Sequence, residues 1–113
     1  MVVAKLDPKG KSNILNECLF MRNNRLKFMP AYIMHDTADG RRYLVTRYIP
    51  YSVEDWLKRQ DNWLQALSAL ARQMLECIRQ LHGIDHIHRD VKPDNFRVDD
   101  QGKVFLIDYG LVK

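Results

Sequence analysis

The sequence predicts an α+β fold, in which an antiparallel sheet with one packed helix is followed by a linker and a mainly helical part. Three observations support this prediction. The first 46 residues read as a strand, a helix and a hairpin, in that order. The longest stretch of helically spaced apolar residues begins at Trp63, and a second hairpin pattern covers residues 96–107.

The chain is expected to open with a strand and a helix. Val2–Leu6 has strand composition, and the turn residues of 7–10 end it. Ser12 or Asn13 can cap a helix over 14–21. The apolar face predicted for this helix consists of Ile14, Leu15, Cys18, Leu19 and Met21.

A hairpin and a short helix follow. Residues 32–34 and 43–46 read as strands, joined by a turn at 36–40 that ends in glycine. Ser52 with Asp55 three residues later resembles a capping box, which predicts the start of a short helix.

The last third of the chain should hold the longest helix and a second hairpin. Gly83 is expected at the helix C-terminal cap, and residues 96–98 and 104–107 read as strands around a turn at 99–102. Most of the helix's apolar residues are expected in the core: Trp63, Leu67, Leu70, Met74, Ile78 and Leu81.

Composition sets broad limits on function. The 113 residues are 46% hydrophobic and 28% charged, which suits one globular domain. The formal charge is +4, but Lys and Arg alternate with Asp and Glu, which favours a solvated surface over a nucleic-acid interface. No apolar run reaches membrane length, and two distant cysteines fit a reducing compartment. We expect an intracellular protein of the cytoplasm or nucleus, without membrane partners.

The second hairpin brings together two candidate metal ligands. Asn95 precedes its first strand and Asp108 follows its second. Because antiparallel strands place these ends side by side, the two oxygen-bearing side chains should converge. Such donors suit Mg²⁺, which binds through one or two protein ligands together with substrate phosphates. The pattern predicts a metal that arrives with a nucleotide, as in phosphoryl transfer from ATP.

The loop before Asn95 carries the groups that such a transfer needs. Asp90 is expected to orient a substrate hydroxyl and accept its proton. Lys92 lies two residues on, and in an extended segment it would offset charge on the moving phosphoryl group. We therefore predict Asp90, Lys92 and Asn95 as catalytic residues.

These residues carry a resemblance to a known family. The run His-Arg-Asp-Val-Lys-Pro-Asp-Asn-Phe, at residues 88–96, is similar to eukaryotic-type Ser/Thr protein kinases of the casein kinase one branch. Asp-Tyr-Gly at 108–110 resembles the vaccinia-related branch. Val-Val-Ala-Lys at 2–5 resembles the strand with the phosphate-binding lysine, and Glu17 fits its helical partner.

The resemblance implies an ATP site. Ala4 would line the adenine pocket and Lys5 would pair with Glu17. Thr46 would be the gatekeeper, while Arg47 and Ile49 would contact the nucleotide from the hinge, Ile49 through its backbone. Asp108 would bind both nucleotide and Mg²⁺, and a protein hydroxyl would receive the phosphate. The family's apolar stack would consist of His88, Tyr109, Met21 and a residue near Ile33.

The same resemblance implies a partial kinase domain: a partial small lobe at 1–46, a hinge at 47–51 and a partial large lobe at 52–113. The glycine-rich strands before Lys5 and the activation segment after Lys113 are expected to be missing, which would leave Arg89 without its usual partners. Gly110 should let the segment after Asp108 pivot. Arg97 stands where the family usually has leucine beneath the adenine, and its charge should have to reach solvent.

Two other functions stay open at this point. A catalytically inactive pseudokinase or decoy could bind another kinase through an unpaired strand edge at 2–6 and an exposed apolar stripe on the long helix. A basic nucleic-acid-binding module has only charge and aromatic content in its favour.

Two alternative metal sites are disfavoured. His82, His86 and His88 near Cys77 are better explained by a helix end and by packing than by zinc. The sequence 36–40 imitates a calcium loop but has its glycine one place early, and a hairpin turn explains it.

Overall fold

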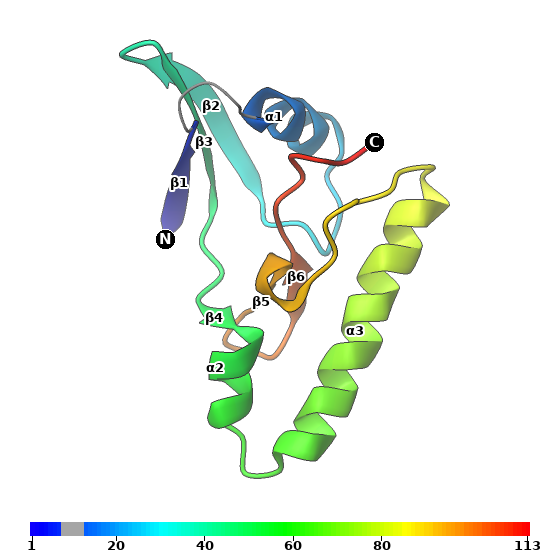
Figure 1. Cartoon of the computed structure of the whole chain (residues 1–113). Helices are drawn as coiled ribbons and strands as arrows, with labels where there is room; N and C mark the ends of the chain where they lie inside the picture. Colours follow the sequence, from blue (N-terminus) through cyan, green and yellow to red (C-terminus); the bar gives the residue numbers. More distant parts are fainter. Residues whose placement is uncertain (8–12) are drawn as a thin grey trace.

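The computed structural model describes residues 1–7 and 13–113. The described elements follow the order β1, α1, β2, β3, β4, α2, α3, a short 3₁₀ turn, β5 and β6. Figure 1 shows two parts, with the sheet of β1, β2 and β3 beside α1 in one and α2 and α3 in the other. The small sheet of β4, β5 and β6 lies between them.

The first sheet is antiparallel and has the order β1-β3-β2. Its strands are β1 (Val2–Leu6), β2 (Tyr32–Ala38) and β3 (Arg41–Arg47). The turn predicted at 36–40 is wrong in its first three residues, because β2 continues through Ala38. Asp39 and Gly40 alone form the turn, with φ of 53° and 76°. Two successive positive φ angles match the right-handed twist of a two-residue hairpin.

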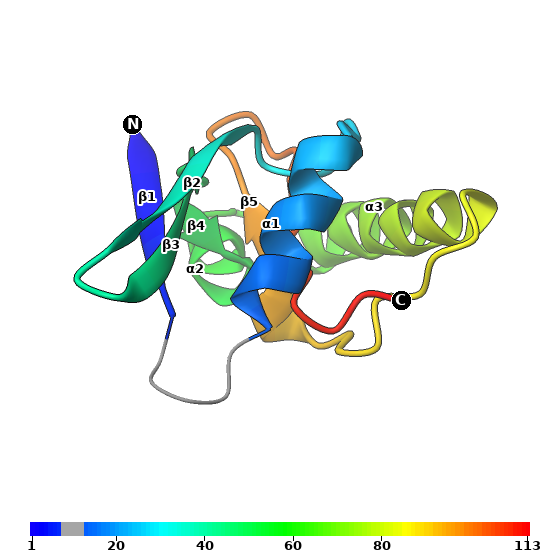
Figure 2. The same cartoon turned by 90° about the horizontal axis from the view of Figure 1, so that it is seen from above.

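Helix α1 (Ile14–Asn23) packs beside this sheet, and seen from above it lies between the sheet and α3 (Figure 2). Asn13 occupies the N-cap position, but its side chain makes no capping hydrogen bond. Ser12 and the predicted turn residues Pro8 to Gly10 lie outside the described part of the chain. The predicted apolar face is wrong for Leu15 and Leu19, which are exposed, and the buried face consists of Ile14, Glu17, Cys18, Phe20 and Met21.

The second sheet has the order β4-β5-β6 and joins the linker to the hairpin that was predicted at 96–107. Its strands are β4 (Tyr51–Ser52), β5 (Phe96–Val98) and β6 (Val104–Leu106). Helix α2 (Val53–Lys58) starts directly after β4, and the Ser52 hydroxyl accepts the backbone N–H of Asp55 at 3.0 Å. The N-cap predicted from the sequence is confirmed.

Helix α3 (Trp63–Gly83) spans one side of the molecule. The Asn62 side chain accepts the backbone N–H of Gln65 and caps the start of the helix. Gly83 is the last helical residue, one position before the cap. The prediction that the helix is mostly core is wrong for two residues, because Trp63 and Leu67 are exposed. Three residues of the helix are buried: Leu70, Cys77 and Leu81.

The core connects both sheets with α1 and α3. Its largest fully buried side chains include Tyr109, Leu70, Leu81 and Leu106. Cys18 and Cys77 are buried free thiols, and burial raises the pKa of Cys77 to about 11. None of the helices in the described ranges is long and apolar enough to cross a bilayer.

Candidate active site

The loop from 84 to 95 is held by a buried histidine. His88 is almost fully buried, and its Nδ1 accepts the backbone N–H of Asp90 at 3.2 Å. Its Nε2 lies 2.9 Å from the carbonyl oxygen of Ile107. Since Nδ1 accepts, Nε2 must carry the proton and donate it, so the neutral Nε2–H tautomer satisfies both contacts. His88 thereby ties the loop to the end of β6.

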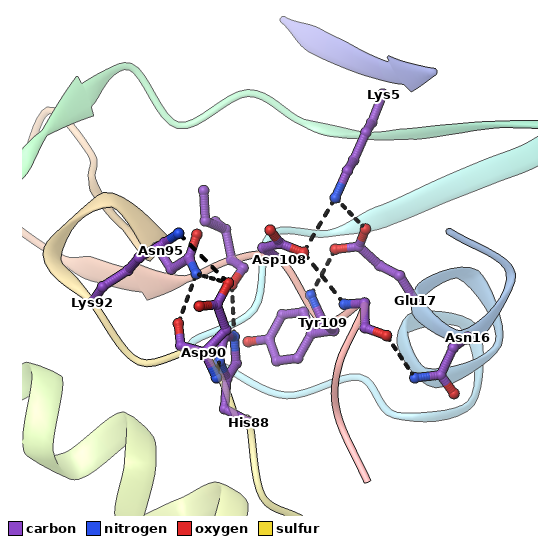
Figure 3. Close-up of polar contacts among 11 residues, drawn as sticks. Lys5, Asn16, Glu17, His88, Asp90, Lys92, Asn95, Asp108 and Tyr109 are labelled. Atoms are coloured by element: carbon purple, nitrogen blue, oxygen red, sulfur yellow. Dashed lines mark hydrogen bonds and ion pairs between the residues drawn. The ribbon is translucent and has the colours of Figure 1, made fainter. Parts of the chain in front are cut away.

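Asp90, Lys92 and Asn95 lie close together in this loop (Figure 3). The Asn95 amide nitrogen donates to the Asp90 carbonyl at 2.7 Å and to its Oδ2 at 3.1 Å. The Lys92 ammonium lies 3.7 Å from the same carboxylate oxygen. Asn95 is buried, whereas the Lys92 side chain is half exposed. The predicted extended conformation of Lys92 agrees with its φ of −158° and ψ of 160°.

An aromatic cluster joins the loop to α1. The ring of Tyr109 meets His88 edge-on at 5.5 Å and stacks on Phe20 at 5.1 Å. Met21 is buried, as the stack inferred from the resemblance requires, but Ile33 is about half exposed. Burial raises the pKa of Tyr109 well above its usual value. The protonated hydroxyl donates to the Leu106 carbonyl at 2.7 Å, which supplies the partner that a buried phenol needs.

Glu17 connects three segments that are distant in sequence (Figure 3). One carboxylate oxygen accepts from the Lys5 ammonium at 2.9 Å, and the other accepts the backbone N–H of Tyr109 at 2.7 Å. Lys5 also reaches Oδ1 of Asp108 at 3.2 Å. Glu17 is 3% exposed, so these contacts replace the water that its charge loses. The carboxylate thus joins β1, α1 and the chain after β6.

Lys5 stays charged in this environment. Burial lowers the pKa of Lys5, but the negative charges and hydrogen bonds of Glu17 and Asp108 outweigh burial and raise the pKa above 10.5. A lysine pKa that is raised on folding stabilises the folded state below its unfolded value, and this stabilisation is lost as the pH rises through the folded pKa. The contribution is therefore complete at neutral pH.

The segment after Asp108 is held from two sides. The Asn16 amide donates to the carbonyls of Gly110 and Val112, at 3.1 and 3.0 Å. Arg89 donates from Nε to the Leu111 carbonyl at 2.7 Å, so it has a backbone partner in this segment. Ile87 and Lys113 exchange two backbone hydrogen bonds of 3.0 Å.

Gly110 packs closely against its neighbours. Its φ is not positive, and a Cβ there would lie 3.2 Å from the Asn13 Cβ and 3.3 Å from Oδ1 of Asp108. A side chain at this position would therefore fit only if these neighbours moved apart. Positive φ angles occur instead at Arg89 and Asp108, at 69° and 61°. Such angles are costly for residues other than glycine and persist where the surroundings enforce them.

A cavity of about 570 Å³ opens between the first sheet and the β5–β6 hairpin, a size that suits a small-molecule ligand. Eight residues predicted to bind nucleotide or metal line it: Ala4, Lys5, Glu17, Thr46, Arg47, Ile49, Asn95 and Asp108. Asp90 and Lys92 are not among the described lining residues, and contact with Asn95 holds Asp90 next to the cavity.

Asn95 and Asp108 fit a magnesium ion that is coordinated partly by the protein and partly by phosphate oxygens. The backbone N–H of Ile107 donates to the Asn95 carbonyl at 2.8 Å, so Asn95 lies opposite the residue before Asp108. The Asn95 amide nitrogen donates to Asp90, so Oδ1 of Asn95 is left as a possible metal ligand. Lys5 contacts only Oδ1 of Asp108, which leaves Oδ2 of Asp108 for the metal. Within the described ranges no cluster of three His, Cys, Asp or Glu side chains could hold a metal. Two oxygen ligands in a cavity suit Mg²⁺ bound together with a nucleotide.

The cavity also contains Arg97, which is partly exposed, in agreement with the expectation for its charge. Its guanidinium has partners in the protein as well, which were not predicted. The guanidinium donates from Nε to the Ile49 carbonyl at 3.1 Å and from Nη2 to the Pro50 carbonyl at 2.9 Å. The linker backbone thereby supplies the polar partners that a half-buried cation needs.

Comparison with known proteins decides the family. The family model described as the protein kinase domain matches residues 1–113.

The chain belongs to the protein kinase family.

Relatives with related names support this assignment. The chain is similar to "Probable casein kinase I homolog" of Encephalitozoon cuniculi, with 28% identity over 90% of the chain and 33% of the relative. Serine/threonine-protein kinase F of Synechocystis is 46% identical over 88% of the chain and 22% of the relative. Casein kinase I homolog 2 of Saccharomyces cerevisiae is 41% identical over 52% of the chain and 12% of the relative. The chain therefore spans a third or less of the length of these relatives.

The kinase resemblance and the α+β fold class predicted from the sequence are both confirmed. Several site contacts were not predicted. Phe20 stacks on Tyr109, Asn16 binds the chain after Asp108, and Arg97 binds the linker. Phe20 lies three residues after Glu17, and this helical spacing could have placed Phe20 on the same face of the helix as Glu17, towards Tyr109. Nothing in the sequence marks the partners of Asn16 and Arg97.

The Tyr109 hydroxyl provides a stability test of this kinase domain. We expect Tyr109→Phe to keep the ring contacts and lower the free energy of unfolding by about 1 kcal/mol, because the hydrogen bond to the Leu106 carbonyl is lost. Urea unfolding measures this change, with Tyr43→Phe on β3 as the matched control. Equal midpoints for Tyr109→Phe and the parent would contradict the expectation.

Proposed function

We propose that this kinase domain binds ATP with Mg²⁺ and transfers the γ-phosphate to a serine or threonine hydroxyl of a protein. One observation carries the proposal: Lys5 donates to both Glu17 and Asp108 in the wall of a cavity that Asn95 also lines. These residues come from four separate segments, and ammonium, carboxylate and amide groups are those that phosphoryl transfer uses.

The proposal assigns each part of the nucleotide to one region of the cavity. Lys5, oriented by Glu17, would bind phosphate oxygens, and Asp108 with Asn95 would hold Mg²⁺ against them. The base would lie towards the linker, near Thr46 and Ile49. Among the described residues the backbone N–H of Ile49 has no hydrogen-bond acceptor, so it is available to a ligand.

Asp90 and Lys92 would act on the second substrate. Asp90 lies beside the cavity with a partly exposed carboxylate, where a substrate hydroxyl can approach and give up its proton. The Lys92 ammonium lies close enough to Asp90 to offset the negative charge of the phosphoryl group during transfer. The bound Mg²⁺ would supply charge neutralisation of the phosphates.

Calorimetry with Asp108→Ala tests nucleotide binding. We expect the parent to bind ATP in the presence of Mg²⁺, and Asp108→Ala to lose at least about tenfold in affinity, because the metal loses a charged ligand. Asp100→Ala, an exposed aspartate in the β5–β6 turn, is the matched control and should bind like the parent. A parent that ignores Mg²⁺, or an unchanged affinity for Asp108→Ala, would contradict the proposal.

A second candidate function is that of a catalytically inactive kinase relative that binds another kinase. The outer edge of β1 favours it, because β1 ends the first sheet and Val2, Val3 and Leu6 are exposed on it. Exposed apolar residues also lie on α3: Trp63, Leu64, Leu67 and Leu75. A bound kinase together with absent phosphotransfer would favour this function over the first.

A further inference from the structure

Arg97 connects the β5–β6 hairpin to the linker between the two sheets. It lies in the middle of β5, opposite Ser52 of β4 and Phe105 of β6. The pairing of β4 with β5 therefore fixes this end of the linker only from Tyr51 onward. The side chain of Arg97 extends this hold by two residues, through its bonds to the carbonyls of Ile49 and Pro50.

Arginine suits this contact for geometric reasons. Nε and Nη2 lie on one edge of the planar guanidinium and reach two successive carbonyls, at 3.1 and 2.9 Å. A lysine ammonium lacks this fixed pair of parallel donors. The two bonds hold the backbone of Ile49, whose N–H is available to a ligand.

Arg97 also lines the cavity, together with Thr46 and Ile49. Hydrogen bonds of a guanidinium lie in its plane, so the bonds to the linker do not use its two faces. No carboxylate of the described residues forms an ion pair with Arg97. A flat cation with free faces in a ligand cavity is suited to stack on an aromatic ring system.

The other arginine of this region has a different partner. Arg47 also lines the cavity, but its guanidinium lies 5.6 Å above the ring of Phe105, which is buried. Its cation–π contact is therefore made within the protein. Arg97 is left as the cation that can face a base at the linker end of the cavity.

We propose that Arg97 recognises the purine base of the nucleotide, with one face of the guanidinium stacked on the base while its edge holds the Ile49 backbone in position. This inference rests on the proposed nucleotide site. It assigns Arg97 to the base and Lys5, Asn95 and Asp108 to the phosphates and metal. The two groups of residues should therefore respond differently to a ligand that has no base.

The test compares Mg²⁺–ATP with Mg²⁺–tripolyphosphate by calorimetry. We expect Arg97→Ala and Arg97→Lys each to bind ATP about tenfold more weakly than the parent. The affinity of both variants for tripolyphosphate should stay within about twofold of the parental value. Each variant loses the stacked face and the paired donors of Arg97 but keeps the phosphate site. Arg72→Ala, which removes an exposed arginine of α3, controls for the loss of one positive charge. Circular dichroism confirms that each variant is folded.

The outcomes separate the two proposals. Arg97→Lys with parental ATP affinity would overturn the inference, because charge alone would then suffice. Equal losses for ATP and tripolyphosphate would also overturn it, since Arg97 would then act on the whole site. Both results leave the proposed function standing when Asp108→Ala still loses Mg²⁺-dependent binding. A parent that binds neither ligand would overturn the inference and the proposed function together.

Discussion

Replacement of Asp90 by asparagine is expected to lower phosphoryl transfer by a factor of about 10² to 10⁴. Asparagine has the same shape, and the hydrogen bond between the Asn95 amide and the Asp90 carbonyl belongs to the backbone, so the loop should keep its conformation. An amide cannot accept the proton of a substrate hydroxyl. Affinity for Mg²⁺–ATP should stay within about twofold, because Asp90 does not line the nucleotide cavity.

This prediction is measured by transfer of radiolabelled phosphate from ATP to dephosphorylated casein, with calorimetry of ATP binding on the same preparations. Asp100→Asn makes the same chemical change in the exposed turn between β5 and β6 and should keep parental activity. Transfer by Asp90→Asn at more than about a tenth of the parental rate would show that Asp90 is not the base.

Removal of the Glu17 carboxylate should cause the largest loss of stability. We expect Glu17→Ala to lower the free energy of unfolding by about 3 kcal/mol. The buried N–H of Tyr109 would lose its acceptor, and Lys5 would lose its closest counter-charge. The value is below that of a fully buried pair because Lys5 is 46% exposed and can turn to water. Glu17→Gln keeps an acceptor and should lose less.

Urea unfolding followed by circular dichroism gives these values. The control is Glu76→Ala on α3, which removes a glutamate that forms an ion pair with Arg79 on an exposed helix face. Surface pairs of this kind contribute little, so its midpoint should not move measurably. A parental midpoint for Glu17→Ala would mean that the three segments do not depend on this carboxylate.

Short-range patterns predicted much of the fold correctly because their physical causes are local. The Ser52 cap depends on a backbone N–H three residues away. The β5–β6 hairpin follows from alternating apolar residues around a turn, and it places Asn95 opposite the residue before Asp108 without reference to the rest of the chain.

Other features depend on distant partners, and sequence patterns do not contain that information. Leu15 and Leu19 have helical spacing, yet α1 buries Glu17 and Phe20 in their place. Trp63 shows the same limit, since apolar spacing predicts a face but not what covers it. The hydrogen bonds of Arg97 were not predicted because its acceptors, the linker carbonyls, lie 47 and 48 positions away.

The chain after Asp108 is held through its backbone, and this has an evolutionary consequence. Carbonyls of Gly110 and Val112 are bound by Asn16, and the carbonyl of Leu111 between them is bound by Arg89 from the opposite direction. Every residue type offers the same carbonyl, so this recognition is independent of side-chain identity. Position 111, whose side chain is exposed, can therefore diversify among descendants of this protein while the attachment of the segment is preserved.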